Sequence, residues 1–188
     1  MSAEKLWVSI DLDNVLAATD PLIRELLASR HGLYLQIENV VEFDYAMCGA
    51  TREQSDDVLH FFHSKACAAV ALEEGASNAL LQIQRLYRIR IVTSRPEGTR
   101  TLTEEWLVAN GVVFDQLVFT NEKAQLCLGS VALVDDSHAN AVDVASAGVP
   151  VLLLDKPWNR KPLPDLVQRI FSWPDGVRWL MIPGAGKE

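Results

Sequence analysis

The sequence is poor in cysteine and has no apolar run long enough to cross a membrane. Its three cysteines, Cys48, Cys67 and Cys127, are odd in number and widely spaced, and they form no Cys-x-x-Cys pair. This usage argues against a disulfide framework and predicts free thiols in a reducing compartment. Because the longest apolar runs fall far short of the roughly 20 residues of a membrane-spanning helix, we expect no association with a membrane.

Positive charge is also scarce. Lys and Arg number 17 and Asp and Glu number 25, which gives a formal net charge of −8. An acidic surface repels a polyanion, so the composition argues against long nucleic acid as a partner. A small phosphorylated molecule can still bind where a few cations gather. The first residues show no signal-peptide pattern, and we expect a cytoplasmic location.

The rest of the composition is that of an ordinary globular chain. Apolar residues make up 49% and charged residues 22% of the 188 positions, which argues against long disorder or a collagen-like repeat. A chain of this length suits one domain with room for a small insertion.

Strand-like and helix-like patterns alternate over most of the chain. Strands are expected at residues 6–12, 89–93, 112–119, 131–134 and 150–154, and helices at 79–87, 99–110 and 139–147. Alternation of this kind predicts βαβ units with right-handed crossovers. The expected fold class is therefore α/β, with a doubly wound parallel sheet.

One long segment breaks the alternation directly after the first strand. A helix is expected from Asp20-Pro21 to Gly32, and a second begins where Thr51 and Gln54 have capping-box spacing and extends to about Val70. We therefore predict an α/β core made of residues 1–17 and 74–188, with a small helical cap at residues 18–73.

Polar clusters follow three of the predicted strands. They are Asp11-Leu12-Asp13-Asn14, Thr93-Ser94-Arg95 and Asp135-Asp136. In open α/β sheets ligands bind at the carboxyl ends of the strands, so these clusters should meet at one edge. Four converging carboxylates require a cation, and ligands that are all oxygen favour Mg²⁺. Each cluster alone could instead be a helix N-cap or an ordinary turn.

These motifs resemble those of the haloacid dehalogenase (HAD) superfamily. The run from Asp11 to Asn14 is similar to the first motif of that family. Thr93-Ser94, Lys123 and Asp135-Asp136 are similar to its second, third and fourth motifs, in the same order. The predicted insertion resembles a C1-type cap. The resemblance implies a HAD-like Rossmann-type core and phosphoryl-transfer chemistry that depends on Mg²⁺.

A narrower resemblance is to the 5′(3′)-deoxyribonucleotidases, the cytosolic type C nucleotidases. It rests on the acidic pair Asp135-Asp136 shortly after Lys123, and on Pro157-Trp158-Asn159 and Phe171-Ser172-Trp173 in the tail. It implies a phosphomonoesterase for small phosphorylated metabolites, with a deoxynucleoside monophosphate as the leading substrate. A phosphatase for a non-nucleotide substrate, a phosphotransferase and a non-catalytic binding module are the alternatives.

The resemblance implies a role for each catalytic residue. Asp11 is the expected nucleophile and forms a phosphoaspartate, while Asp13 protonates the leaving oxygen and then activates water. Lys123 bridges the Asp11 carboxylate and the phosphate. The expected ligands of Mg²⁺ are Asp11, the backbone carbonyl of Asp13 and Asp136, with Asp135 as an outer or alternate ligand.

The phosphate oxygens are expected to meet Thr93 and Ser94, as in an oxyanion site. Arg95 departs from the usual family pattern and adds a cation beside that site, although an ordinary salt bridge would also explain it. Asn14 stands where glycine is most common, and asparagine can adopt the same turn conformations.

Aromatic residues of the predicted cap are candidate contacts for the leaving group. Phe43 and Tyr45 could stack on a nucleobase, or they could simply fill the core of the cap. Trp158, Trp173 and Trp179 are more typical of core packing in the tail.

Three other arrangements fit the sequence less well. His60 and His63 have helical metal-ligand spacing but no third ligand. Ser137 and His138 beside Asp136 lack the nucleophile elbow of a hydrolytic triad, and the Ser and His are adjacent. A signalling receiver domain would carry its acidic pair at the start of the chain, whereas here the pair comes last.

Overall fold

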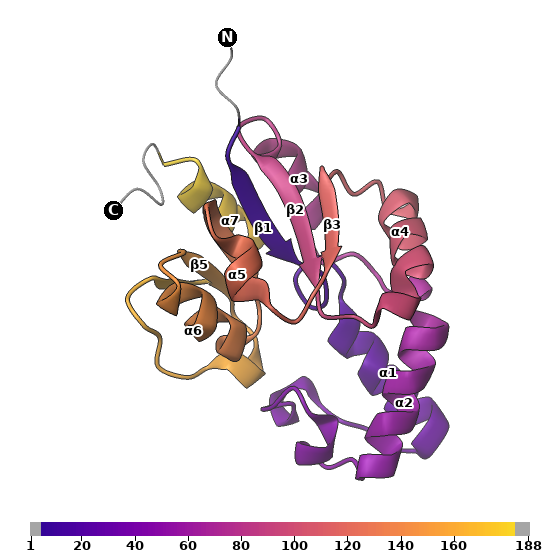
Figure 1. Cartoon of the computed structure of the whole chain (residues 1–188). Helices are drawn as coiled ribbons and strands as arrows, with labels where there is room; N and C mark the ends of the chain where they lie inside the picture. The colour runs from indigo at the N-terminus through magenta and orange to yellow at the C-terminus, as the bar shows by residue number, and fades with distance from the viewer. Residues whose placement is uncertain (1–4, 183–188) are drawn as a thin grey trace.

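The computed structural model describes residues 5–182 (Figure 1). Six strands form one sheet in the order β3-β2-β1-β4-β5-β6, and every neighbouring pair is parallel. The strands are β1 (Trp7–Asp11), β2 (Arg88–Thr93), β3 (Gln116–Phe119), β4 (Ser130–Asp135), β5 (Val151–Leu154) and β6 (Val167–Ile170). The order runs outward in both directions from β1, as in a doubly wound sheet.

Helices cover both faces of this sheet. They are α3 (Ala76–Ile83), α4 (Arg100–Ala109), α5 (Lys123–Cys127), α6 (His138–Ser146) and α7 (Trp173–Leu180). Ala132 and Val134 of β4 belong to a core cluster with residues of α3, α4 and α7. Leu133, between them, belongs to a second cluster with residues of α6 and with Cys127. Side chains on a strand alternate between faces, so the two clusters are the two faces. This arrangement confirms the predicted doubly wound α/β class.

Several predicted boundaries differ from the observed ones. Residues 112–115 lie before β3 rather than in it, although Val112 is buried against the main core. The helix predicted at 79–87 is α3, which begins after Gly75 at a left-handed φ of 81°. The helix expected to reach Val70 breaks at Lys65, and a 3₁₀ turn at Ala66–Ala69 follows.

Three short elements were not predicted. α5 is five residues long, and β6 has four residues of which two are buried. α7 contains Pro174 and Gly176, which usually argue against a helix. Pro174 is tolerated because it lies in the first turn, where its missing N–H is not needed, and the side chain of Ser172 caps that turn.

The inserted segment, residues 18–73, contains α1 (Thr19–His31), α2 (Arg52–Ser64) and the 3₁₀ turns Ile37–Asn39 and Tyr45–Met47. Gly32 ends α1 in a left-handed conformation, as predicted. Thr51 and Gln54 form the predicted capping box of α2. Figure 1 shows this segment beyond the carboxyl ends of β1 and β2.

The chain enters and leaves the inserted segment at one place. The Ala18 amide donates to the carbonyl of Ala71 at 2.8 Å, and the Glu73 amide donates to the carbonyl of Leu16 at 2.7 Å. An isolated bridge between Ala17 and Leu72 lies in the same stretch, so its two ends are held together.

Two further expectations concern the described part of the chain. Cys48, Cys67 and Cys127 are all free thiols, which confirms the prediction from their spacing. Within residues 5–182, no helix combines the length and the apolar character that a bilayer crossing demands.

Candidate active site

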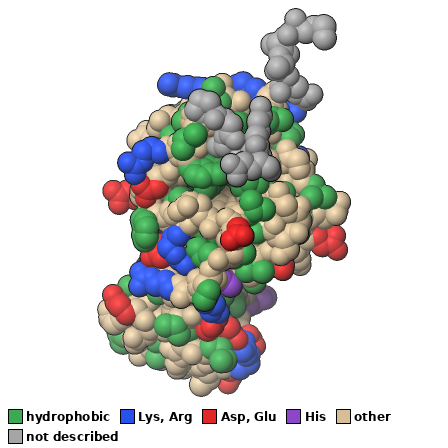
Figure 2. Space-filling view, turned by 90° about the vertical axis from the view of Figure 1, so that its left-hand side faces the viewer, with side chains coloured by type: hydrophobic (Ala, Val, Ile, Leu, Met, Phe, Trp, Pro, Cys, Tyr) green, Lys and Arg blue, Asp and Glu red, His purple; other side chains and the backbone are tan. Residues whose placement is uncertain are grey.

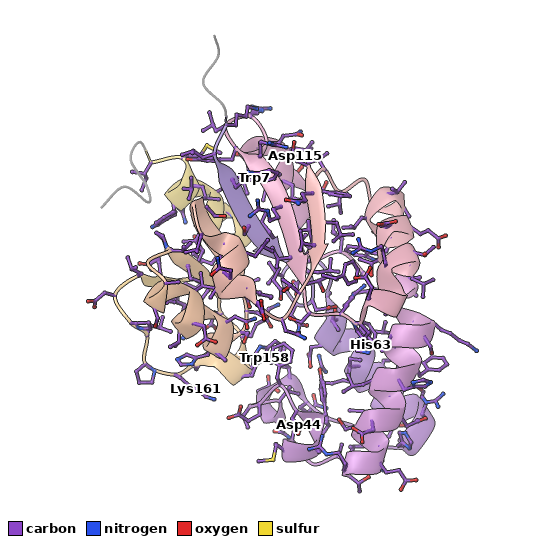
Figure 3. The ribbon with its side chains drawn as sticks, viewed as in Figure 1. Trp7, Asp44, His63, Asp115, Trp158 and Lys161 are labelled. Atoms are coloured by element: carbon purple, nitrogen blue, oxygen red, sulfur yellow. The ribbon has the colours of Figure 1, made fainter. Side chains whose placement is uncertain are left out.

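A cavity of about 340 Å³ lies between the carboxyl edge of the sheet and the inserted segment. The sheet edge contributes charged and polar side chains: Asp11, Asp13, Ser94, Arg95, Lys123 and Asp136. The inserted segment contributes mainly apolar ones: Ile23, Phe43, Tyr45, Leu59, Phe62 and His63. The cavity is therefore polar at the sheet and apolar opposite it. Figure 3 shows Trp158 and His63 at this junction.

Salt bridges also join the two parts at the surface. The Nζ of Lys161, in the tail, lies 3.1 Å from a carboxylate oxygen of Glu42 in the inserted segment. Figure 2 shows Lys and Arg side chains gathered where the upper and lower parts of the molecule meet on one face. Neither Lys161 nor Glu42 belongs to the cavity lining.

Lys123 bridges two carboxylates that end neighbouring strands. Its Nζ lies 2.7 Å from Oδ1 of Asp11 and 2.8 Å from Oδ2 of Asp135. Lys123 begins α5, and this position brings its side chain back to the ends of β1 and β4. Burial would lower the pKa of Lys123, but the two carboxylates outweigh it and raise that pKa. Lys123 is therefore an ammonium in the folded protein.

The carboxylates nevertheless exceed the cations at this point. Burial raises the pKa of Asp11 to about 7, although the Lys123 ammonium opposes the rise. Burial also raises the pKa of Asp136 well above its ordinary value, and the charges of Asp135 and Asp11 add to the effect. A further cation would relieve this repulsion.

The donor set fits a hard divalent cation. Oxygen atoms of Asp11, Asp135 and Asp136 lie within 4.8 Å of one another. Asp135 is already engaged, because it accepts from Lys123 and, at 2.7 Å, from the Ser137 amide. Oδ1 of Asp136 is buried without a hydrogen-bond partner among the described residues. Such an atom is costly unless a cation meets it, and oxygen ligands suit Mg²⁺.

Asp13 is held by two donors on the same side of the cavity. Arg95 donates from Nε to Oδ2 at 2.9 Å and from Nη2 to Oδ1 at 2.7 Å, and the Thr19 hydroxyl donates to Oδ1 at 2.5 Å. Burial would raise the pKa of Asp13, but Arg95 and Thr19 outweigh it and lower that pKa. Arg95, expected beside the phosphate, thus lines the cavity as the partner of Asp13.

The two hydroxyl residues after β2 have different positions. Ser94 lines the cavity, and its Oγ also lies 3.4 Å from the carbonyl oxygen of Thr120. Thr93 is buried, and its Oγ1 accepts from the Arg95 amide at 3.1 Å. Ser94 therefore lies on the cavity wall, while the Thr93 side chain shapes the turn.

Asn14 adopts the conformation that its place in the motif requires. It has a φ of 58° and is the one non-glycine residue with positive φ in the described part of the chain. Its side-chain oxygen accepts from the Asp20 amide at 2.7 Å, which ties the turn to the start of α1. The prediction that asparagine adopts a turn conformation that glycine also uses is confirmed.

Both aromatic residues singled out in the predicted cap line the cavity. The Tyr45 hydroxyl donates to Oδ1 of Asp20 at 2.9 Å, so only its ring is available to a ligand. Phe43 is half-exposed and packs edge-on against Trp158, with ring centroids 5.5 Å apart.

Sequence reasoning missed several lining residues. Ile23, Leu59 and Phe62 look like ordinary apolar helix positions, so nothing in the sequence marks them as cavity residues. His63 lines the cavity, but neither it nor His60 belongs to a potential metal-binding cluster in the described part of the chain.

The predicted core tryptophans are buried or partly buried, as expected. Trp158 has an additional contact that was not predicted. Its indole Nε1 donates to Oδ2 of Asp136 at 2.9 Å. A buried indole N–H needs an acceptor, but the sequence does not indicate which one.

Comparisons with known proteins identify the family and the fold of the chain. Residues 5–182 match the family described as 5′ nucleotidase, deoxy (pyrimidine), cytosolic type C protein. The candidate nucleotidase YqfW of Bacillus subtilis is 24% identical over 181 residues, covering 93% of each chain. A HAD family hydrolase of Deinococcus radiodurans, solved with bound phosphate and sodium, has a TM-score of 0.65 at 18% identity and covers 98% of each chain.

A haloacid dehalogenase-like hydrolase of Streptococcus pneumoniae also has a TM-score of 0.65, at 12% identity, and covers 94% of this chain and 99% of its own. At such identities these structures show the fold, while the family match spans nearly the whole described chain. The chain therefore belongs to the cytosolic type C 5′-nucleotidase family and is a phosphoric monoester hydrolase with the fold of the HAD hydrolases.

Proposed function

We propose that this hydrolase acts on small phosphomonoesters, with deoxynucleoside monophosphates as its substrate class, Mg²⁺ as its cofactor and Asp11 as its nucleophile. The observation that carries the proposal is the placement of Asp11 on the polar side of the cavity. Its carboxylate contacts the Lys123 ammonium and lies near an acidic pair in which one oxygen has no hydrogen-bond partner among the described residues.

The reaction has two steps. A carboxylate oxygen of Asp11 attacks phosphorus, and the bond from phosphorus to the leaving oxygen breaks. Water then attacks the phosphoaspartate, which releases inorganic phosphate and restores Asp11. Dividing the hydrolysis in this way replaces one difficult displacement by two easier ones.

Asp13 moves the protons. It gives a proton to the leaving oxygen in the first step and takes one from the attacking water in the second. The pairing with Arg95 keeps Asp13 as a carboxylate in the free enzyme, which is the form that the second step needs. The negative charge of an arriving phosphate raises the pKa of Asp13 and so favours the protonated form that the first step needs.

Asp11, Asp136 and the backbone carbonyl of Asp13 would hold Mg²⁺, with Asp135 fixed behind them by Lys123. The bound cation would offset the repulsion between the nucleophile and the substrate phosphate. Lys123 and Ser94 face the phosphate oxygens, while Thr93 and Arg95 hold the turn and the proton-transfer residue.

The inserted segment acts as a cap that selects the leaving group. Phe43, Phe62 and the ring of Tyr45 give the cavity a flat apolar surface. The charge of Arg95 is paired with Asp13. Such a surface suits an uncharged planar group such as a nucleobase. The nucleotidase name of the Bacillus subtilis relative supports the same substrate class. We place the reaction in the cytoplasm, where nucleoside monophosphates are available.

Phosphate release from a panel of monoesters tests the proposal. The panel holds deoxynucleotides, ribonucleotides, sugar phosphates and an aryl phosphate, each with Mg²⁺ and with a chelator. The expected result is Mg²⁺-dependent release that is fastest for deoxynucleoside monophosphates. Release that is fastest for sugar phosphates would overturn the substrate class, and release in the chelator would overturn the role of the metal.

A further inference from the structure

The turn after β5 contacts the end of β4. This turn is the 3₁₀ segment Pro157–Asn159, and β5 is the neighbour of β4 in the sheet. Trp158 is 5% exposed, and its indole N–H donates to Oδ2 of Asp136. The catalytic steps above assign no task to this tryptophan.

Asn159 fixes the same turn and the same aspartate. Its side chain is fully buried, and Nδ2 donates to the backbone carbonyl of Asp136 at 2.8 Å and to that of Leu154 at 2.7 Å. Its Oδ1 accepts from the guanidinium of Arg169 at 2.6 Å. Trp158 and Asn159 therefore hold the side chain and the backbone of Asp136 respectively.

The neighbouring carboxylates Asp135 and Asp136 have hydrogen-bond donors of different charge. Asp135 meets an ammonium, which neutralises its charge. Asp136 meets a neutral indole, which occupies one oxygen but brings no positive charge. An indole N–H can donate but cannot accept, and here it donates to Oδ2 of Asp136. The other oxygen of Asp136, Oδ1, is buried and has no hydrogen-bond partner among the described residues. One carboxylate oxygen of Asp136 lies within 4.8 Å of oxygens of Asp11 and Asp135.

We propose that Trp158 is a positioning residue, whose indole N–H orients Asp136 so that Oδ1 serves as the ligand of the divalent cation. This inference rests on the proposed function, because that function makes Asp136 a metal ligand. Partners of this kind, which orient a metal ligand from behind, typically change metal affinity by about 10- to 100-fold when they are removed.

The chain offers a matched control for the loss of an indole N–H. Trp106 is 1% exposed, and its Nε1 donates to the backbone carbonyl of Val70 at 2.7 Å. Trp158→Phe and Trp106→Phe therefore remove the same group from similar surroundings. Only the first loses a hydrogen bond to a carboxylate of the proposed metal site.

Calorimetric titration with Mg²⁺, without substrate, tests the inference on four proteins: the wild type, Trp158→Phe, Trp106→Phe and Asp136→Asn. We expect Trp158→Phe to bind Mg²⁺ about 10-fold or more weakly, Trp106→Phe to bind as the wild type does, and Asp136→Asn to lose binding. Wild-type affinity in Trp158→Phe, or an equal loss in Trp106→Phe, would overturn the role of Trp158 alone. Wild-type affinity in Asp136→Asn would instead overturn the metal assignment of the proposed function.

A measurement on the wild type avoids dependence on the folding of a variant. With ¹⁵N-labelled indoles, each of the five tryptophans contributes one Nε1–H resonance. We expect Mg²⁺ to shift one of them strongly, and the same resonance to move in metal-free Asp136→Asn. If Mg²⁺ binds and no indole resonance shifts, the Trp158 N–H is not hydrogen-bonded to a ligand of the metal, and the inference fails.

Discussion

Arg95 holds Asp13 in a bidentate ion pair inside the protein. Nε and Nη2 of Arg95 each contact one oxygen of Asp13, and the arginine side chain is 1% exposed. Nη1 is engaged as well, because it donates to the Thr103 hydroxyl at 3.2 Å. Arg95 was expected beside the phosphate, which stays a prediction, and its observed pairing leads us to propose that it also keeps the pKa of Asp13 low.

Removing the Arg95 charge should shift the pH profile of the enzyme. Arg95 and Thr19 lower the pKa of Asp13 against the effect of burial. In Arg95→Gln that pKa rises, so Asp13 is protonated at higher pH and the acidic limb of kcat moves to higher pH by about 1 unit. The measurement is kcat against pH at saturating Mg²⁺. Arg95→Lys keeps the charge and should shift the limb less, whereas an unmoved limb in Arg95→Gln would contradict the assignment.

The metal-free protein should become less stable as pH rises. The pKa of Asp11 is about 7, and that of Asp136 is raised well above its ordinary value by burial and by neighbouring carboxylates. In the unfolded chain both lie near 4. Stability is therefore fully present below about pH 4 and is lost as pH rises toward the folded pKa values, near 7 for Asp11.

Asp136→Asn should relieve this loss. In the presence of a chelator at pH 7 we expect its Tm to exceed that of the wild type by about 3 °C or more. Asp143, on the exposed side of α6, provides the control, and Asp143→Asn should leave the Tm unchanged. A Tm of Asp136→Asn equal to or below that of the wild type would contradict the buried repulsion.

Phe43 should contribute to substrate binding. It lines the cavity and is half-exposed, so it can stack on a nucleobase. Stacking on an aromatic side chain contributes about 1–3 kcal/mol per base, so Phe43→Ala should raise KM for a deoxynucleoside monophosphate about 10-fold. Val41 is also exposed on the same stretch but is absent from the lining, and Val41→Ala serves as the control. Equal KM values for the two variants would rule out the stacking role.

The left-handed turn at Asn14 should tolerate glycine and resist alanine. A Cβ at a φ of 58° costs about 1–2 kcal/mol for most residues, and asparagine offsets this by its bond to the Asp20 amide. Asn14→Ala should lower the free energy of unfolding by about 1–2 kcal/mol in urea titrations, and Asn14→Gly by less. The reverse order of the two variants would show that the backbone conformation is not what matters.

The strands that carry the site were predictable because their patterns are simple. β1 and β4 are almost wholly buried runs that end in carboxylates, and a parallel sheet brings such ends to one edge. The end of the chain was less predictable. β6 and α7 are short, and α7 contains proline and glycine, so their local sequence favours no regular structure. They form because the sheet offers them an apolar face.

The partners of the site residues could be predicted only in part. Lys123 near Asp11 was expected from the family resemblance and is observed. The indole contacts could not be inferred, because Trp158 and Trp106 look alike in sequence. One donates to a carboxylate and the other to a backbone carbonyl. The acceptor depends on how separate elements pack, which local patterns do not record.

The central claim is that Asp11 becomes phosphorylated. The most direct test is acid quenching of the enzyme during turnover of a deoxynucleoside monophosphate, followed by mass spectrometry of its peptides. The account predicts that one phosphoryl group is found on the peptide containing Asp11 and that Asp11→Asn shows neither the adduct nor phosphate release. Rapid phosphate release by Asp11→Asn, or a phosphoryl group trapped on another residue, would contradict it.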